Sequence, residues 1–297
     1  MRKRISIVFL ALLALPAYAD DAGHPVTLWK VAGVSNSVYL LGSIHLLREQ
    51  DYPLPTILDV AYADAEVLIM EVDMDDLDPF AAQAAFTTYG VLQDDRTLSD
   101  LMGADAYQQA VTAADAVGIP LEMLSKTEPW YAAMTIEIMM LNSIGFNPML
   151  GVEMHMMSKA AADGKPIEGF ETIVEQIQFL DGMSLQAQRD MLLATLTESA
   201  NLGEMMDKII DAWRHGDTEH LGSEMLSELE KHEELNKVLV VDRNARWVDS
   251  IEDLLDDKDD YLIIVGTLHL VGEGGVPERL RSAKHDVQQL SEPPTVR

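Results

Sequence analysis

The sequence of 297 residues predicts an α/β fold, in which a long helical middle region packs on, or covers, a β-sheet. Three observations predict it. Apolar runs of strand length occur near both ends of the chain and around residues 67 and 167, helical periodicity fills the segments between them, and no low-complexity linker divides the chain. We therefore expect a single domain over residues 20–297, with an α+β arrangement as the alternative.

The first elements are a predicted hairpin, a helix and a third strand. Residues 28–31 and 38–41 are apolar runs separated by the turn-forming segment 33–37, which predicts two paired strands. A helix is expected over 54–65. The continuous apolar run 67–72 then predicts a buried strand, and this order of elements is typical of an α/β core.

The middle of the chain is predicted to be helical. Helices are expected over 104–117, 129–144 and 152–162, followed by a strand over 166–170. Helical periodicity continues from about 172 to 255, with breaks at Gly182, Gly203 and Gly216. The end of the chain predicts a strand over 261–265, a helix from Pro277 to 284, and a strand over 287–290.

Residues 1–19 have the pattern of a secretory signal peptide. A basic start is followed by the apolar run 5–15, a helix-breaking proline, and Ala17-Tyr18-Ala19 as the cleavage site. The apolar run is short for a membrane span, although a retained anchor is the alternative. The chain has no cysteine, which excludes disulfides, cysteine-ligated zinc and thiol catalysis. We expect cleavage after Ala19, a periplasmic or secreted protein, and no stable membrane insertion afterwards.

Acidic residues dominate the charge, with a formal net value of −29 at pH 7. This field repels phosphate backbones and anionic lipids, so nucleic acid is not an expected partner. The charge either keeps the surface soluble or steers cationic substrates or metal ions. Apolar residues make up 48% of the chain and charged residues 24%, as in soluble globular proteins.

A short motif occurs twice, near opposite ends of the chain. Residues 38–47 align without gaps to residues 262–271, and each segment ends an apolar strand with glycine, serine or threonine, an aliphatic residue and histidine. Two such strands lying side by side would bring His45 and His269 into one cleft at the edge of a sheet. Imidazole can serve there as a metal ligand or as a general base. Either histidine taken alone could be purely structural.

Acidic and basic side chains near these motifs are further candidates. Glu71 ends the strand 67–72 and could bind a metal or activate water, or it could simply be solvated with the acidic loop that follows. Arg243, with Asn244 beside it, precedes the second motif and could stabilise an oxyanion or bind a substrate carboxylate, unless it only pairs with a nearby acid. Arg48, three residues after His45, has a similar potential role.

The segment 134–157 is rich in methionine. Thioethers and imidazole suit copper(I), so this segment raises the possibility of a copper site. Methionine at helical spacing is, however, usually core filler.

Taken together, these motifs resemble the TraB/GumN family over residues 27–290. The resemblance rests on the paired histidine motifs, Glu71, the segments 169–172 and 175–176, and residues 243–244. The family is related to the Tiki-type metallopeptidases and, more distantly, to erythromycin-esterase-like hydrolases. It implies a central mixed sheet flanked by helices, and a hydrolytic site that is metal-dependent in Tiki-like members and metal-free in the esterase-like ones.

The predicted function is therefore an exported hydrolase that cleaves peptide or amide bonds. The resemblance implies that His45, His269 and Glu171 hold a divalent metal ion such as zinc, manganese or cobalt. Glu71 would activate water, Arg243 would stabilise the tetrahedral intermediate, and Arg48 and Asn244 would bind substrate. Thr172 and Glu175 have the spacing of a helix capping box and are left out of the site.

The alternative is a non-catalytic exported protein that sequesters a peptide or assists surface-polysaccharide production. The partner in either case is a peptide or another small molecule. The sequence leaves the oligomeric state open.

Overall fold

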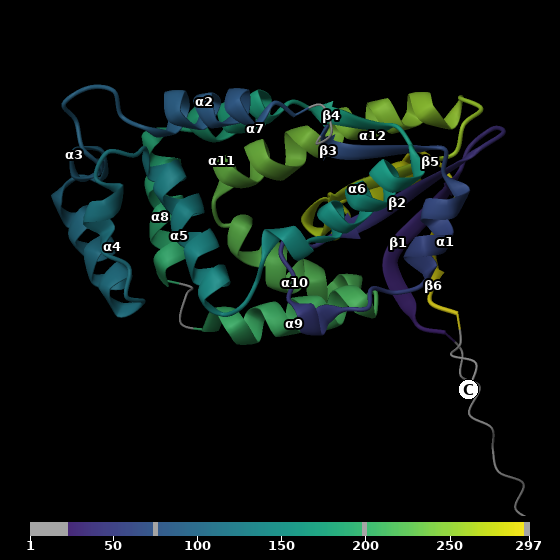
Figure 1. Cartoon of the computed structure of the whole chain (residues 1–297), viewed down its shortest axis with the longest axis horizontal. Coiled ribbons are helices and arrows are strands. Elements are labelled where there is room, and N and C mark those ends of the chain that lie inside the picture. Colours follow the sequence, from purple (N-terminus) through teal and green to yellow (C-terminus); the bar gives the residue numbers. More distant parts are fainter. Residues whose placement is uncertain (1–22, 74–76, 198–200, 294–297) are drawn as a thin grey trace, which may run out of the picture.

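The computed structural model describes residues 23–73, 77–197 and 201–293, so the predicted signal peptide lies outside the described residues. A six-stranded sheet with the order β4-β3-β5-β2-β1-β6 stands at one end of the molecule (Figure 1). Helices flank it, which confirms the predicted α/β class with a mixed sheet. The strands are β1 Pro25–Ala32, β2 Ser37–Ser43, β3 Val67–Val72, β4 Ile167–Glu171, β5 Tyr261–Gly266 and β6 Val287–Ser291.

Four neighbouring strands, β4, β3, β5 and β2, run parallel. β1 pairs antiparallel with β2, which confirms the predicted hairpin, and β6 adds antiparallel to β1. The two strands that carry the repeated motif are therefore direct neighbours. Their register pairs Ser43 with Gly266, so the two motifs are offset by one residue. Parallel strands end at the same edge of a sheet, and this edge receives the side chains that follow β2, β3, β4 and β5.

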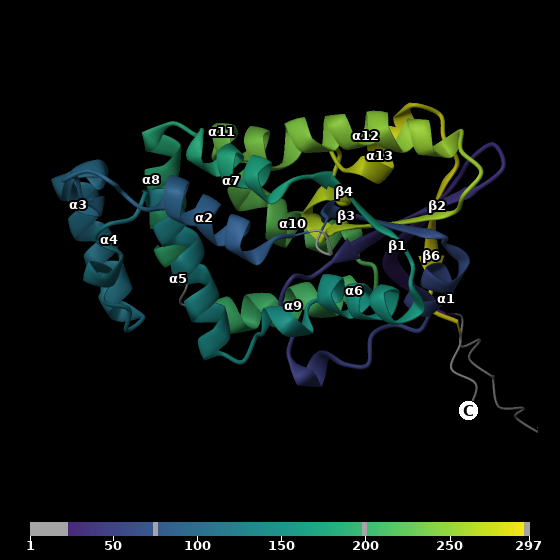
Figure 2. The ribbon, with the colours of Figure 1, turned by 45° about the horizontal axis from the view of Figure 1, so that its top comes forward.

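Helices cover both faces of the sheet (Figure 2). α1 (Ile57–Asp64), α6 (Val152–Asp163) and α9 (Leu202–Arg214) pack on one face, where their apolar side chains share a core with Leu262 and Ile264 of β5. α12 (Asp242–Leu255) and α13 (Val276–Ser282) cover the other face, where Ile263 points. Alternate residues of β5 thus enter opposite cores, as the pleat of a strand requires.

The rest of the helical region extends away from the sheet (Figure 1). α5 (Pro129–Ser143) packs against α8 (Leu185–Thr197), and α3 (Leu98–Met102) and α4 (Ala104–Ala116) join the same apolar cluster. α2 (Pro79–Gly90) lies beside α7 (Ile173–Asp181). The remaining helices are α10 (Thr218–Leu229) and α11 (Glu233–Asn236). The helical middle therefore both packs on the sheet and projects beyond its edge.

Most predicted helices and strands are confirmed, with two differences. The helix expected over 54–65 begins only at Ile57, because the ring of a proline disfavours the helical conformation of the residue before it, here Leu54 before Pro55. The break predicted at Gly203 falls slightly earlier in the chain: α8 ends at Thr197 and α9 begins at Leu202, so Gly203 itself lies in the first turn of α9. In the described part of the chain, no helix combines the length and the apolar composition needed to cross a membrane.

Candidate functional site

Four of the predicted site residues come together at the edge where the parallel strands end. His45 follows β2, Glu71 is the last residue but one of β3, Glu171 ends β4, and His269 follows β5. The serine and threonine of the repeated motif tie the two strand ends together, because the Thr267 hydroxyl donates to the Ser43 carbonyl at 2.9 Å. The repeated motif therefore builds one shared edge, as its sequence predicts.

Arg243 lies at the centre of this group, in the first turn of α12. Its Nη2 is 2.6 Å from Glu71 Oε2 and 2.8 Å from Glu171 Oε2, and its Nε donates to Glu171 at 3.0 Å. Its Nη1 contacts the Leu239 carbonyl at 3.2 Å and His269 Nε2 at 3.1 Å. A guanidinium group has five N–H donors, and the hydrogen bonds to Glu171, Leu239, His269 and Glu71 occupy four of them. Arg243 therefore has at most one donor left for a substrate.

The segment before Arg243 is a π-helical turn, Lys237–Val241, which continues directly into α12. Such turns are frequent at functional sites, because the wider turn re-aims the side chains that follow. Here the Leu239 carbonyl of this turn accepts from Arg243.

His269 is buried and held in one tautomer. The Asn244 amide donates to the His269 and Gly274 carbonyls, so its Oδ1 faces His269 Nδ1 at 2.7 Å and must accept a hydrogen bond from the Nδ1–H group. Nε2 of His269 then carries the lone pair that accepts from Arg243. Burial lowers the pKa of His269 to about 4, which agrees with a neutral ring. The Trp247 ring packs against it at 4.5 Å between centroids.

Glu71 is held as a carboxylate at the centre of the site. Burial alone would raise its pKa, but the neighbouring charges, including Arg243, and the Gly266 amide lower it to about 2. That amide donates to Glu71 Oε1 at 2.6 Å. The Gln176 side chain donates to Glu71 at 3.3 Å and to Glu171 at 3.2 Å.

His45 differs from the other members of the group because its side chain is 60% exposed. Its Nδ1 lies 2.6 Å from Glu153 Oε1, which also accepts from the Ser43 hydroxyl. The charge of Glu153 raises the pKa of His45 to about 9. The imidazole is thus oriented by a carboxylate at Nδ1, while no hydrogen bond to Nε2 occurs among the described residues.

Glu153 reaches His45 because α6 starts against the loop after β2. The Val152 amide donates to the Ile44 carbonyl at 3.1 Å, and a Cβ on Gly151 would lie only 2.2 Å from the His45 carbonyl oxygen. Only glycine allows this close approach. Oε2 of Glu153 is buried without a hydrogen-bond partner in the described structure, an arrangement that costs stability.

A pocket of about 260 Å³ opens beside His45. Its polar lining consists of His45, Glu71, Glu153 and Gln176. The apolar lining comes from β3 and from the segment that leads into α6, and consists of Met70, Val72, Pro148, Met149 and Met154. The exposed imidazole of His45 and the carboxylates of Glu71 and Glu153 therefore line the same cavity.

The contacts of the three predicted metal ligands do not fit a shared metal ion. Both oxygens of Glu171 accept from Arg243, and Arg246 Nη2 adds a further contact at 2.9 Å. The lone pair of His269 that a metal would use faces Arg243. Across residues 23–73, 77–197 and 201–293, no group of three or more His, Asp or Glu side chains is arranged to hold a metal ion. The divalent metal stays a prediction from the resemblance.

The two residues predicted to bind substrate have other partners. Arg48 lies outside the group and pairs with Asp51 at 2.9 Å and with Asp207 at 2.8 Å. Asn244 has no exposed surface and orients His269. The capping box of Thr172 and Glu175 is confirmed.

Two further residues of the site carry no role in the sequence prediction. Glu153 lies in the first turn of α6, where an acidic residue is common at any helix start, so its sequence position gave no signal. Gln176 is within the segment that carries the family resemblance, and a role for it emerges only from its contacts with the two glutamates.

The chain resembles known proteins along most of its length. It is 26% identical over 247 residues to the Escherichia coli (strain K12) protein called "Uncharacterized protein YbaP", covering 82% of this chain and 87% of that protein. The Shigella flexneri protein of the same name matches to the same extent. No solved structure matches. The sequence model of the TraB/PrgY/gumN family matches residues 27–289, and the chain therefore belongs to this family.

Proposed function

We propose that this chain is an exported hydrolase that cleaves peptide or amide bonds with water activated by His45. One observation carries the proposal. The imidazole is oriented at Nδ1 by the Glu153 carboxylate, and its side chain is 60% exposed and lines a pocket that also contains Glu71. A carboxylate, an imidazole and an open pocket are the parts that general-base hydrolysis requires.

The space beside Gly266 supports a site for the attacking water. A Cβ on Gly266 would lie 3.2 Å from His45 Nε2 and 3.2 Å from Glu71 Oε1, so these two atoms are at most twice that distance apart. One water molecule beside this position, and not at it, could hydrogen-bond to both atoms, because the position itself is within bonding distance of the Gly266 Cα.

In the proposed reaction, His45 Nε2 takes a proton from this water as its oxygen bonds to the substrate carbonyl carbon. Glu153 stabilises the imidazolium that forms. The same Nε2–H then donates its proton to the leaving nitrogen as the carbon–nitrogen bond breaks, which releases an acid and an amine.

The surrounding charges affect this reaction by changing the pKa of His45. Its pKa of about 9 means that the neutral ring, which is the form that accepts a proton, becomes more abundant as the pH rises toward that value. Arg243 is a positioning residue in this scheme, because it holds Glu71 and His269 in place. No step runs through a metal ion.

A peptide library incubated with the mature protein, with products identified by mass spectrometry, tests this function. Wild type is compared with His45→Ala and Glu153→Gln, and with His285→Ala as a matched control, because His285 pairs with Glu252 away from the pocket. We expect cleavage by wild type and His285→Ala, none by His45→Ala, and a large loss in Glu153→Gln. Absence of cleavage by a folded wild type would contradict the proposal and favour the non-catalytic binding protein.

Elemental analysis of the purified protein distinguishes the proposed metal-free mechanism from the metal-dependent one that the family resemblance implies. After stripping and reloading with zinc, manganese or cobalt, wild type is compared with the His45→Ala/His269→Ala double variant. The proposed mechanism predicts no difference in metal content and full activity in a chelator. Stoichiometric metal in wild type alone would instead support the ligand set implied by the family resemblance.

Amino-terminal sequencing of the periplasmic fraction tests export and cleavage after Ala19.

A further inference from the structure

We infer that the pocket beside His45 selects substrates with an apolar, uncharged side chain next to the bond that is cleaved. This inference rests on the proposed function, because it gives the pocket a part of the substrate to hold. It goes further in naming the substrate class, and three features of the pocket carry it.

The first feature is the composition of the lining. Three methionines, Met70, Met149 and Met154, together with Val72 and Pro148, form the apolar side of the cavity. Met149 is 66% exposed, which leaves a large apolar side chain in contact with water at the pocket. Burial of an apolar group against these side chains would remove that surface from water, and flexible thioethers adapt to groups of different shape.

The second feature is charge. The polar side of the lining contains two carboxylates, Glu71 and Glu153, and the chain as a whole has a net charge of −29. The basic group of the lining is His45, and its charge is offset by Glu153, so an acidic side chain would still meet repulsion from Glu71. The histidine beside the pocket is already paired with Glu153.

The third feature is size. At about 260 Å³ the cavity lies below the usual range for drug-sized ligands, so it fits one side chain and the adjoining peptide group. Extended polymer chains would have to continue outside it. The pocket thus suits a single apolar residue, such as leucine or methionine, at the cleaved bond.

Matched peptides test this selectivity. The peptides Ala-Ala-X-Ala-Ala, blocked at both ends, carry X as leucine, methionine, asparagine, aspartate or lysine. Leucine and asparagine have nearly the same shape, so their comparison isolates polarity. We expect kcat/KM for leucine and methionine to exceed that for asparagine by about tenfold or more, with aspartate cleaved slowest. Mass spectrometry locates the cut on either side of X.

Variants of the pocket lining provide a second test of this selectivity. Met149→Gln and Met154→Gln should reduce the ratio of kcat/KM for leucine over asparagine, chiefly through KM. Met123→Gln is the matched control, because Met123 is 69% exposed and is not part of the pocket lining. It should leave the ratio unchanged.

Binding of the same peptides to His45→Ala, measured by calorimetry, separates the two proposals. Cleavage without any preference for X would overturn the apolar pocket and leave the hydrolase standing. Tighter binding of the leucine peptide without cleavage by wild type would overturn the hydrolase and support the pocket. Neither cleavage nor preferential binding would overturn both.

Discussion

Arg243 is the residue on which the buried charges of the site depend. It contacts Glu71 and Glu171, whose side chains are only 16% and 4% exposed. Removing one partner of a buried ion pair leaves an uncompensated charge, so Arg243→Ala should lower the free energy of unfolding by about 3–5 kcal/mol. Arg243→Lys should recover little of it, because one ammonium group cannot reach the acceptors that a guanidinium fork reaches.

Denaturant unfolding at pH 7 measures this loss. Arg246→Ala is the matched control, since Arg246 also contacts Glu171 but its side chain is 51% exposed. Its loss should stay below about 1 kcal/mol, as for exposed ion pairs. Equal losses of unfolding free energy in Arg243→Ala and Arg246→Ala would contradict the idea that the buried carboxylates depend chiefly on Arg243.

Gly266 provides a test of the proposed water position. Its φ of −51° and ψ of 135° are open to alanine, so Gly266→Ala introduces no backbone strain. The added methyl group would, however, stand 3.2 Å from both His45 Nε2 and Glu71 Oε1. We expect hydrolysis to fall by at least about tenfold, with a shift in the midpoint of thermal unfolding of only a few degrees. Full activity in this variant would exclude a water between these two atoms.

At the scale of elements, the start of α1 illustrates a pH-dependent contact. The Glu292 carboxylate accepts from the Thr56 amide and hydroxyl at 2.8 and 2.6 Å and from the Ile57 amide at 3.0 Å. Partial burial would raise the pKa of Glu292, but these hydrogen bonds outweigh it and lower the pKa below its usual value. The cap therefore stabilises the fold at neutral pH and loses this contribution as the pH falls through the lowered pKa.

Glu292→Gln should destabilise the protein by about 1 kcal/mol at pH 7, as for the loss of other helix caps. The difference between wild type and variant should shrink as the pH falls below about 4, because wild type then loses the same charge. Thermal unfolding at several pH values measures it. A difference that stays constant down to pH 3 would contradict the capping role.

The elements also show what the sequence can and cannot predict. Continuous apolar runs identified β2, β3 and β5, because a strand buried on both faces needs apolar residues at every position. The paired motif placed His45 and His269 at one edge, because parallel neighbours end together. The contact of Glu153 with His45 spans 108 residues and depends on how α6 docks, which no local pattern encodes. The contacts of Arg243 with Glu71 and Glu171 could not be predicted for the same reason, because they form only when α12 packs beside β3 and β4.

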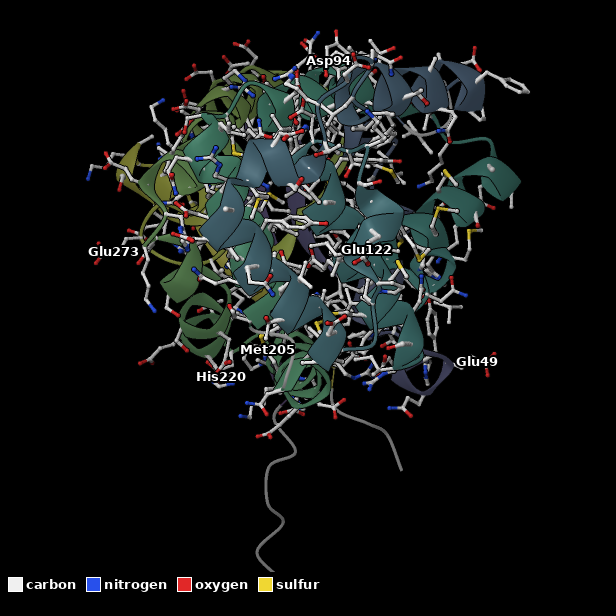
Figure 3. The ribbon with its side chains drawn as sticks, turned by 90° about the vertical axis from the view of Figure 1, so that its left-hand side faces the viewer. Glu49, Asp94, Glu122, Met205, His220 and Glu273 are labelled. Atoms are coloured by element: carbon white, nitrogen blue, oxygen red, sulfur yellow. The ribbon has the colours of Figure 1, made fainter. Side chains whose placement is uncertain are left out.

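At the scale of the whole molecule, the acidic charge spreads over the surface. The labelled residues Glu49, Asp94, Glu122 and Glu273 lie on different sides in Figure 3. The chain has 50 acidic and 21 basic residues, so like-charge repulsion between carboxylates opposes the compact state.

Added salt should therefore stabilise the protein. Ions screen repulsion between exposed charges over about 10 Å at 0.1 M, whereas the buried contacts of Arg243 are screened much less. We expect the midpoint of thermal unfolding to rise by a few degrees between about 0.01 and 0.5 M sodium chloride at pH 7, and to rise equally in potassium chloride, since the effect depends on ionic strength and not on one bound cation. A midpoint that falls with salt would mean that surface ion pairs outweigh the repulsion. A rise confined to one cation would point to a specific binding site instead of general screening.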